Sequence, residues 1–84
     1  NITFLNADQK IDGQFDIVVA NILANPLRLL APVLCSHVKE NGGALILSGI
    51  LESQAAELIG IYQHFLSTKT AQNLDGWALL VGRR

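Results

Sequence analysis

The sequence has no methionine, a single cysteine and no charge run of either sign. A chain without methionine cannot begin at its own initiator residue, and this one opens directly on the apolar segment 2–5, so we interpret it as a fragment of a larger protein. The lone Cys35 excludes an internal disulfide, which is typical of a reducing compartment and predicts a cytoplasmic protein. No apolar run approaches the roughly 18–20 residues that span a bilayer, and no signal-peptide pattern begins the chain.

Catalytic motifs with a recognisable spacing are also missing. There is no HExxH pattern, no P-loop and no convincing Ser/His/Asp or Cys/His set, so catalytic residues stay unassigned and no metal site is expected. The formal net charge is −1, and no basic patch predicts contact with nucleic acid or a membrane. A glycine-rich turn from strand to helix is absent too, because Gly42-Gly43 precedes a strand. Ser48-Gly49 does follow a strand and could line a ligand crevice.

Half of the residues are apolar, which predicts a packed core in one small α/β domain. The segment Phe15–Leu27 carries the most informative pattern. Residues Ile17–Ala20 predict a buried strand, and Asn21 opens a polar loop. Asn25 suits the N-cap of a helix and Pro26 its first position. Ligands of open α/β sheets bind outside the carboxyl ends of the strands, where Asn21 is expected. Its amide either orients a ligand or closes the turn through local backbone hydrogen bonds, and the pattern leaves both open.

Periodicity predicts the remaining elements. Helices are expected over Pro26–Lys39, kinked or split by Pro32 and ended at Asn41-Gly42-Gly43, and over Glu52–Leu66. Further strands are expected at Ile2–Leu5, Ala44–Ser48, Ser67–Gln72 and Trp77–Gly82. Apolar strands joined by a helix predict a right-handed parallel crossover, and the Leu74-Asp75-Gly76 turn predicts a terminal antiparallel hairpin. Cys35 is expected as a small buried hydrophobe. The second helix is expected to bury Ala55, Leu58, Ile59, Tyr62, Phe65 and Leu66.

The motifs that carry a family resemblance are Val19–Leu27 (VANILANPL), Leu30-Ala31-Pro32, Gly42-Gly43, Leu47–Leu51 (LSGIL) with Gln54, and Gly76-Trp77 through Arg83. In this order and spacing they resemble the PrmA family over nearly the whole chain. Members of this family are S-adenosylmethionine-dependent methyltransferases that modify lysines and the N-terminal amine of a large-subunit ribosomal protein, protein eleven. The resemblance implies that the parent of this fragment is such an enzyme, with that ribosomal protein as its partner.

The resemblance also implies a Rossmann-like class I methyltransferase fold, of which residues 1–84 would form the C-terminal half of the catalytic domain. In that fold the sheet order is 3-2-1-4-5-7-6 with strand 7 antiparallel, and this chain would supply strand 3 or its end, then strands 4 to 7. The family's Asn at the end of strand 4 contacts the cofactor and matches Asn21. Asp8 lies where related methyltransferases place an acid or amide near the adenine, in a loop that varies within the family.

Several parts of such an enzyme are missing from this chain: the glycine loop of cofactor binding, the acid that holds the ribose, and the N-terminal substrate-recognition domain. Two alternatives stay open, namely another Rossmann-like methyltransferase acting on a small amine or nucleic acid, and a non-catalytic α/β interaction module. Without strands 1 and 2 of the family's sheet, the apolar strand Ile17–Ala20 would be an exposed edge. We therefore expect the fragment to self-associate.

We predict that the isolated chain of 84 residues does not bind S-adenosylmethionine measurably, because it holds only one wall of the site. Isothermal titration calorimetry should give no heat of binding. Micromolar affinity for the isolated chain would contradict this prediction.

Overall fold

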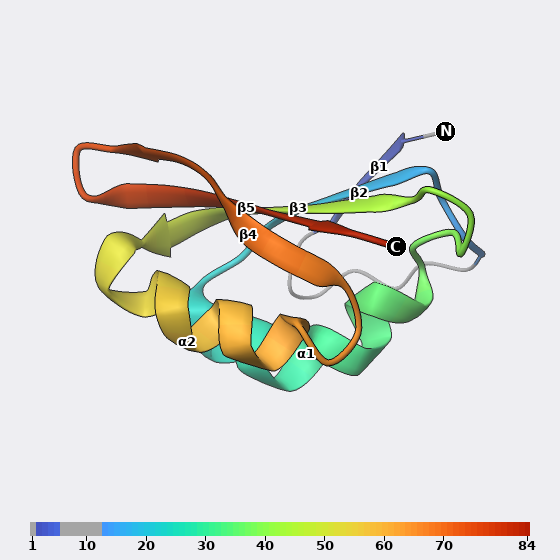
Figure 1. Ribbon diagram of the computed structural model, residues 1–84, viewed down its shortest axis with the longest axis horizontal. Coiled ribbons are helices and arrows are strands. Elements are labelled where there is room, and N and C mark those ends of the chain that lie inside the picture. Colours follow the sequence, from blue (N-terminus) through green and yellow to red (C-terminus); the bar gives the residue numbers. More distant parts are fainter. Residues whose placement is uncertain (1, 6–12) are drawn as a thin grey trace.

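The computed structural model describes residues 2–5 and 13–84 of the chain. The elements in chain order are β1 (Ile2–Leu5), β2 (Ile17–Asn21), α1 (Ala24–Ser36), β3 (Ala44–Leu51), α2 (Glu52–Tyr62), β4 (Ser67–Leu74) and β5 (Trp77–Arg83). Within the described residues the strands form one sheet in the order β1-β2-β3-β5-β4 (Figure 1). None of the helices in these residues is long and apolar enough to cross a membrane.

The directions of strand pairing divide the sheet into two parts. β1, β2 and β3 are parallel to one another, whereas β5 runs antiparallel to both of its neighbours, β3 and β4. The parallel pairing of β2 and β3 across α1 and the terminal β4–β5 hairpin are therefore confirmed. The run β2-β3-β5-β4 also matches the 4-5-7-6 part of the sheet order that the family resemblance implies. The direct pairing of β1 with β2 differs from that order, in which two other strands separate strands 3 and 4.

β1 lies beside β2, which changes where the exposed edge falls. Residues 2–5 pair in parallel with residues 17–20, so β2 is an inner strand. The expectation that Ile17–Ala20 would form the edge is wrong, because β1 supplies the backbone partners that β2 was expected to lack. The edge belongs to β1 instead, where Ile2 is 57% and Phe4 is 68% exposed.

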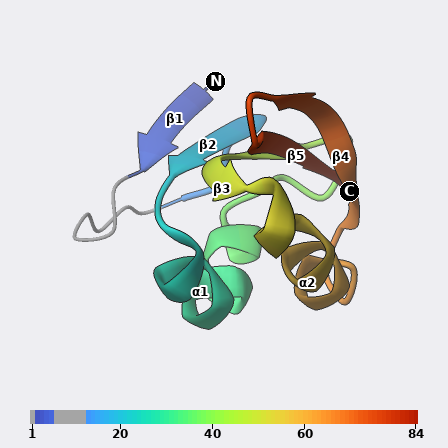
Figure 2. The ribbon, with the colours of Figure 1, turned by 90° about the vertical axis from the view of Figure 1, so that its left-hand side faces the viewer.

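Both helices pack against the same face of the sheet (Figure 2). The strands alternate accordingly, since Val18 and Ala20 of β2 are buried while Ile17 and Val19 on the other face are partly exposed. One core joins sheet and helices, formed by Val18, Ala20, Ile22, Ala24, Leu27, Ala31, Leu34, Cys35, Val38, Leu45, Leu47, Ile50, Ala55, Leu58, Tyr62, Leu66, Ala78 and Leu80. Burial of this apolar surface is the main force that holds the helices on the sheet.

The start of α1 differs from the prediction. The Leu27 N–H donates to the Leu23 carbonyl at 3.2 Å, so Leu23 is the N-cap and the helix begins at residue 24. The N-cap assignment of Asn25 is wrong, because Asn25 lies inside the first turn and its Oδ1 accepts a hydrogen bond from Arg28. Pro26 is still compatible with this position, since the first N–H groups of a helix have no partner within it.

The end of α1 is set by a contact with a distant part of the chain. The helix stops at Ser36 rather than near Lys39, because Val38 forms a parallel bridge with Phe15. The Phe15 N–H donates to the His37 carbonyl at 2.7 Å, and the Lys39 N–H donates to the Phe15 carbonyl at 3.0 Å, so the chain beyond Ser36 pairs with Phe15 instead of continuing the helix. Such a pairing joins residues far apart in sequence, so the periodicity within residues 26–39 could not reveal it.

Two further expectations for this region are corrected. Of the two effects predicted for Pro32, the split is wrong, because the helix runs unbroken past it, and the kink stays a prediction. Gly42 does not end the helix either, because it lies in the turn before β3 with a φ of +81°. The positive φ required in that turn accounts for a glycine at position 42, as a left-handed helix terminus would also have done.

α2 ends at Tyr62, before the predicted Leu66. Gln63 turns the chain into β4, since its Nε2 donates to the Thr68 carbonyl at 2.9 Å and its Oε1 accepts from the Thr68 N–H at 3.1 Å. Leu66 still reaches the core, but Phe65 is 40% exposed, so its predicted burial is wrong.

The last three strands are longer than predicted. β3 does not stop at residue 48 but continues to Leu51, past a register shift against β5 between Leu47 and Ile50. In the hairpin turn Asp75 has a φ of 52° and Gly76 a φ of 82°. Two successive residues with positive φ are what a tight type I′ turn requires, and an Asp-Gly pair tolerates them.

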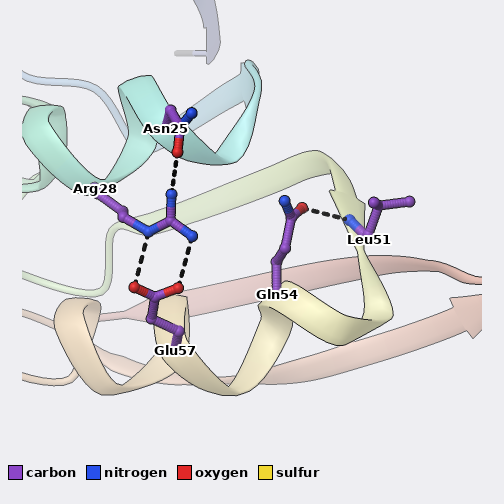
Figure 3. Close-up of polar contacts among 5 residues, drawn as sticks. All are labelled: Asn25, Arg28, Leu51, Gln54 and Glu57. Atoms are coloured by element: carbon purple, nitrogen blue, oxygen red, sulfur yellow. Dashed lines mark hydrogen bonds and ion pairs between the residues drawn. The ribbon is translucent and has the colours of Figure 1, made fainter.

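Polar contacts tie α1 to α2 outside the core (Figure 3). The Arg28 Nε and Nη2 atoms donate to the two carboxylate oxygens of Glu57 at 2.8 and 2.6 Å. These hydrogen bonds lower the pKa of the Glu57 carboxyl below its ordinary value.

In the interior the Tyr62 hydroxyl donates to the Leu27 carbonyl at 2.8 Å, which gives the largest fully buried side chain a polar partner.

The last residue of the chain closes the far end of α1. Arg84 Nη2 donates to the Cys35 carbonyl at 2.6 Å, and Arg84 Nε donates to the Val38 carbonyl at 3.1 Å. Carbonyls at a helix C-terminus lack intrahelical partners, so a guanidinium there is favourable. The Arg84 N–H also donates to the Gly43 carbonyl at 3.0 Å and joins the end of the chain to the start of β3.

We expect the isolated chain to associate through the outer edge of β1, because this strand leaves backbone groups and apolar side chains uncovered. Phe4→Lys should shift the chain toward monomer in light scattering at high concentration, since an edge lysine disfavours pairing. Leu29→Lys is the matched control, because Leu29 is 82% exposed on α1, away from the edge. A stable monomer of the unaltered chain, or equal effects of both variants, would contradict this mode of association.

Candidate functional site

Asn21 is the last residue of β2 and stands at the carboxyl edge of the sheet. Its register partner is Ser48 on β3, so parallel pairing brings two polar side chains to the same edge. The Asn21 side chain is exposed. No group in residues 2–5 and 13–84 forms a hydrogen bond with its amide. Within these residues the local bonds that would give Asn21 a turn-closing role are therefore not formed.

The side-chain oxygen of Asn21 rests against Gly49. This glycine has a φ of +77° and lies within the register shift of β3 against β5. A Cβ added to Gly49 would lie 2.6 Å from Asn21 Oδ1. The backbone of β3 thus leaves open the space that the amide of Asn21 occupies.

An open hollow of about 250 Å³ lies beside Gly49. It is lined by Ser48, Gly49, Gln72, Leu74, Trp77, Ala78 and Leu79. Ser48 and Gly49 line the hollow, although they lie within β3 and not after a strand as the sequence predicted. The hairpin residues of its wall were not predicted. A local sequence pattern cannot show which strand the hairpin pairs with, so it could not place the hairpin at this hollow. In the structure, the exposure of the large apolar side chain of Trp77, 52%, draws attention to this part of the hollow's wall.

The groups gathered at this edge are an amide, a hydroxyl and an indole, with no carboxylate, imidazole or amine among the residues named above. Such a set can bind and orient a ligand but is poorly suited to proton transfer. Asp8, the second cofactor-binding residue expected from the sequence, lies outside the described residues. Asp16 precedes the opposite end of β2 and is exposed, with Lys39 Nζ at 3.4 Å from its Oδ1.

The cysteine and the histidines lie away from the carboxyl edge. Cys35 is buried near the end of α1, and burial raises the pKa of its thiol to about 11, which confirms a packing role. His37 Nδ1 donates to the Gly13 carbonyl at 2.6 Å, and His64 is exposed beyond the end of α2. In the described part of the chain, no cluster of three His, Cys, Asp or Glu side chains could hold a metal ion.

Parallel strands joined by a helix and a terminal antiparallel hairpin define a Rossmann-like α/β fold with a mixed sheet. Residues 1–84 match the model of the family described as "Ribosomal protein L11 methyltransferase (PrmA)". The chain belongs to this family.

Several relatives carry the same description. The ribosomal protein L11 methyltransferase of Neisseria meningitidis serogroup C is 48% identical over 81 residues, which cover 96% of this chain and 27% of the relative. The corresponding protein of Dechloromonas aromatica is 47% identical over 83 residues, covering 96% and 28%. The chain therefore spans little more than a quarter of the length of these relatives. The crystal structure of ribosomal protein L11 methylase from Lactobacillus delbrueckii subsp. bulgaricus matches with a TM-score of 0.72 and 35% identity, over 88% of this chain and 39% of that one.

The buried thiol predicts a loss of stability in alkaline solution. Cys35 has an ordinary pKa of 9.0 when the chain is unfolded and about 11 when it is folded, so between these values the folded state binds more protons and loses stability as the pH rises. Urea unfolding should give a lower free energy of unfolding at about pH 10.5 than at about pH 8. Cys35→Ala lacks the thiol and should lose less stability between the two conditions. Equal losses in both proteins would show that the thiol is not the cause.

Proposed function

We propose that this chain forms the C-terminal part of the catalytic domain of an S-adenosylmethionine-dependent protein methyltransferase that acts on amines of ribosomal protein L11. The observation that carries the proposal is the exposed amide of Asn21 at the carboxyl edge, in a chain that belongs to this family. The description shared by the relatives supports the substrate. The free thiol of Cys35 and a ribosomal substrate both support a cytoplasmic location.

The carboxyl edge fits part of the cofactor. The Asn21 amide offers one acceptor and two donors, and the missing side chain of Gly49 leaves the space in which this amide lies. Asn21 would contact S-adenosylmethionine here, and Asp8 is proposed as a second contact near the adenine. When bound, this cofactor supplies a methyl group from its sulfonium centre.

The contribution of the chain's own residues to catalysis is positioning. The acceptor amine must be neutral, with its lone pair directed at the methyl group. The side-chain oxygen of Asn21 can accept a hydrogen bond from such an amine and fix its direction without taking a proton. The hollow beside Ser48 and Gly49 is largely apolar, with Leu74, Trp77 and Leu79 in its wall. An amine bound there would be favoured in its neutral form by the apolar surrounding.

A chimera tests this proposal. Residues 1–84 replace the matching segment of the Neisseria meningitidis relative, and transfer of labelled methyl groups from S-adenosylmethionine to purified ribosomal protein L11 is measured. We expect the chimera to methylate ribosomal protein L11, and Asn21→Ala to slow the reaction about tenfold, the order of magnitude of one lost hydrogen bond. Asn41→Ala, an exposed asparagine in the turn before β3, is the matched control and should leave the rate unchanged.

A folded chimera that transfers no methyl group would contradict the proposal. Transfer to a free amine or to RNA, but not to ribosomal protein L11, would favour another Rossmann-like methyltransferase. An unchanged rate in the Asn21→Ala chimera would remove this residue from the site while leaving the assignment of the chain intact.

A further inference from the structure

We propose that Gly49 is a positioning residue, whose missing side chain lets the amide of Asn21 lie against β3 in the orientation that its ligand requires. The inference rests on the proposed role of Asn21 and deepens it. Gly49 lies on β3, whereas Asn21 lies on β2. Gly49 contacts the amide of Asn21 and not the reacting atoms.

The strand register brings the two residues together. Asn21 pairs with Ser48, and Gly49 is the next residue of β3, where the pairing with β5 shifts between Leu47 and Ile50. This irregularity turns the Gly49 backbone to a φ of +77°. The side-chain oxygen of Asn21 then lies where a Cβ of residue 49 would point.

The close approach involves one atom. An added Cβ would be 2.6 Å from Asn21 Oδ1, and the next nearest atoms, Asn21 Cγ and the Ile22 carbonyl oxygen, would be at 3.8 and 3.9 Å. A distance below 3.0 Å between such atoms cannot persist, so one of them must move. The atom that yields is the end of an exposed side chain and not the backbone. Alanine at position 49 should therefore rotate the Asn21 amide and leave the sheet in place.

Other glycines separate this effect from ordinary backbone strain. Gly42 and Gly76 have φ values of +81° and +82°, close to that of Gly49. At both of them an added Cβ would meet nothing within 4 Å. Alanine at any of these positions must adopt an unfavourable left-handed conformation, but at position 49 it must also displace Asn21. Gly42→Ala is therefore a matched control that carries the strain without the contact.

The first measurement requires no activity. In ¹H–¹⁵N spectra of the 84-residue chain, the side-chain amide signals of Asn21 should shift in Gly49→Ala and stay in place in Gly42→Ala. Both variants should lower the melting temperature by similar amounts. Unshifted Asn21 amide signals in Gly49→Ala would overturn the proposal.

The second measurement uses the chimera and compares the dissociation constant of S-adenosylmethionine in Asn21→Ala, Gly49→Ala and the double variant. Each single variant should raise the constant about tenfold, the order of magnitude of one lost hydrogen bond. The double variant should be no worse than Asn21→Ala alone, because Gly49 acts only through Asn21. Gly42→Ala should bind as the unaltered chimera does.

The outcomes keep the two claims apart. Fully additive losses in the double variant, or equal affinities of the Gly49→Ala and Gly42→Ala chimeras, would overturn the positioning role of Gly49. A shifted Asn21 amide together with unchanged affinity in Asn21→Ala would instead overturn the ligand contact of Asn21. If Gly49→Ala does not fold while Gly42→Ala does, backbone strain alone is not the cause, and the double variant must recover folding. In that case failure to recover would show that the added methyl group does not clash with Asn21.

Discussion

The parallel pairing of β2 with β3 determines where everything else in the site lies. Its register sets Asn21 opposite Ser48 at the carboxyl edge. A slip of one residue would send the Asn21 side chain into the face covered by the helices, because side chains alternate between the faces of a sheet. The buried Val18 and Ala20 oppose such a slip, since it would expose them. The apolar core thus fixes the position of an exposed polar residue that takes no part in it.

The helices hold this pairing in place from one side. Tyr62 of α2 donates its buried hydroxyl to the carbonyl of Leu27 in α1, while the Arg28–Glu57 ion pair joins the same helices at the surface. Arg84 binds carbonyls at the end of α1. None of these three contacts involves a residue of the carboxyl edge described above. The residues that collect there are therefore available to a ligand, and the absence of acids and bases among them favours orientation over proton transfer.

The sequence was sufficient for the elements whose signal is local. Apolar runs located β2 and the first part of β3, and the Asp75-Gly76 pair located the hairpin turn. It was insufficient where an element is ended by a distant partner. α1 ends earlier than predicted where Val38 pairs with Phe15. α2 ends earlier than predicted where the Gln63 side chain forms two hydrogen bonds with the backbone of Thr68. The same holds for the site: Asn21 could be identified from its place after a strand, but its contact with Gly49 depends on a register shift that no local pattern encodes.

The central claim is that Asn21 at the carboxyl edge of β2 is a ligand contact held in place by the backbone of β3. A crystal structure of the chimera with bound S-adenosylmethionine tests this most directly. We expect the Asn21 amide to lie about 3 Å from a polar atom of the cofactor or of the acceptor amine, the distance of a hydrogen bond, with its side-chain oxygen still packed on Gly49. A cofactor bound elsewhere, or an Asn21 side chain turned into solvent away from Gly49, would contradict the account.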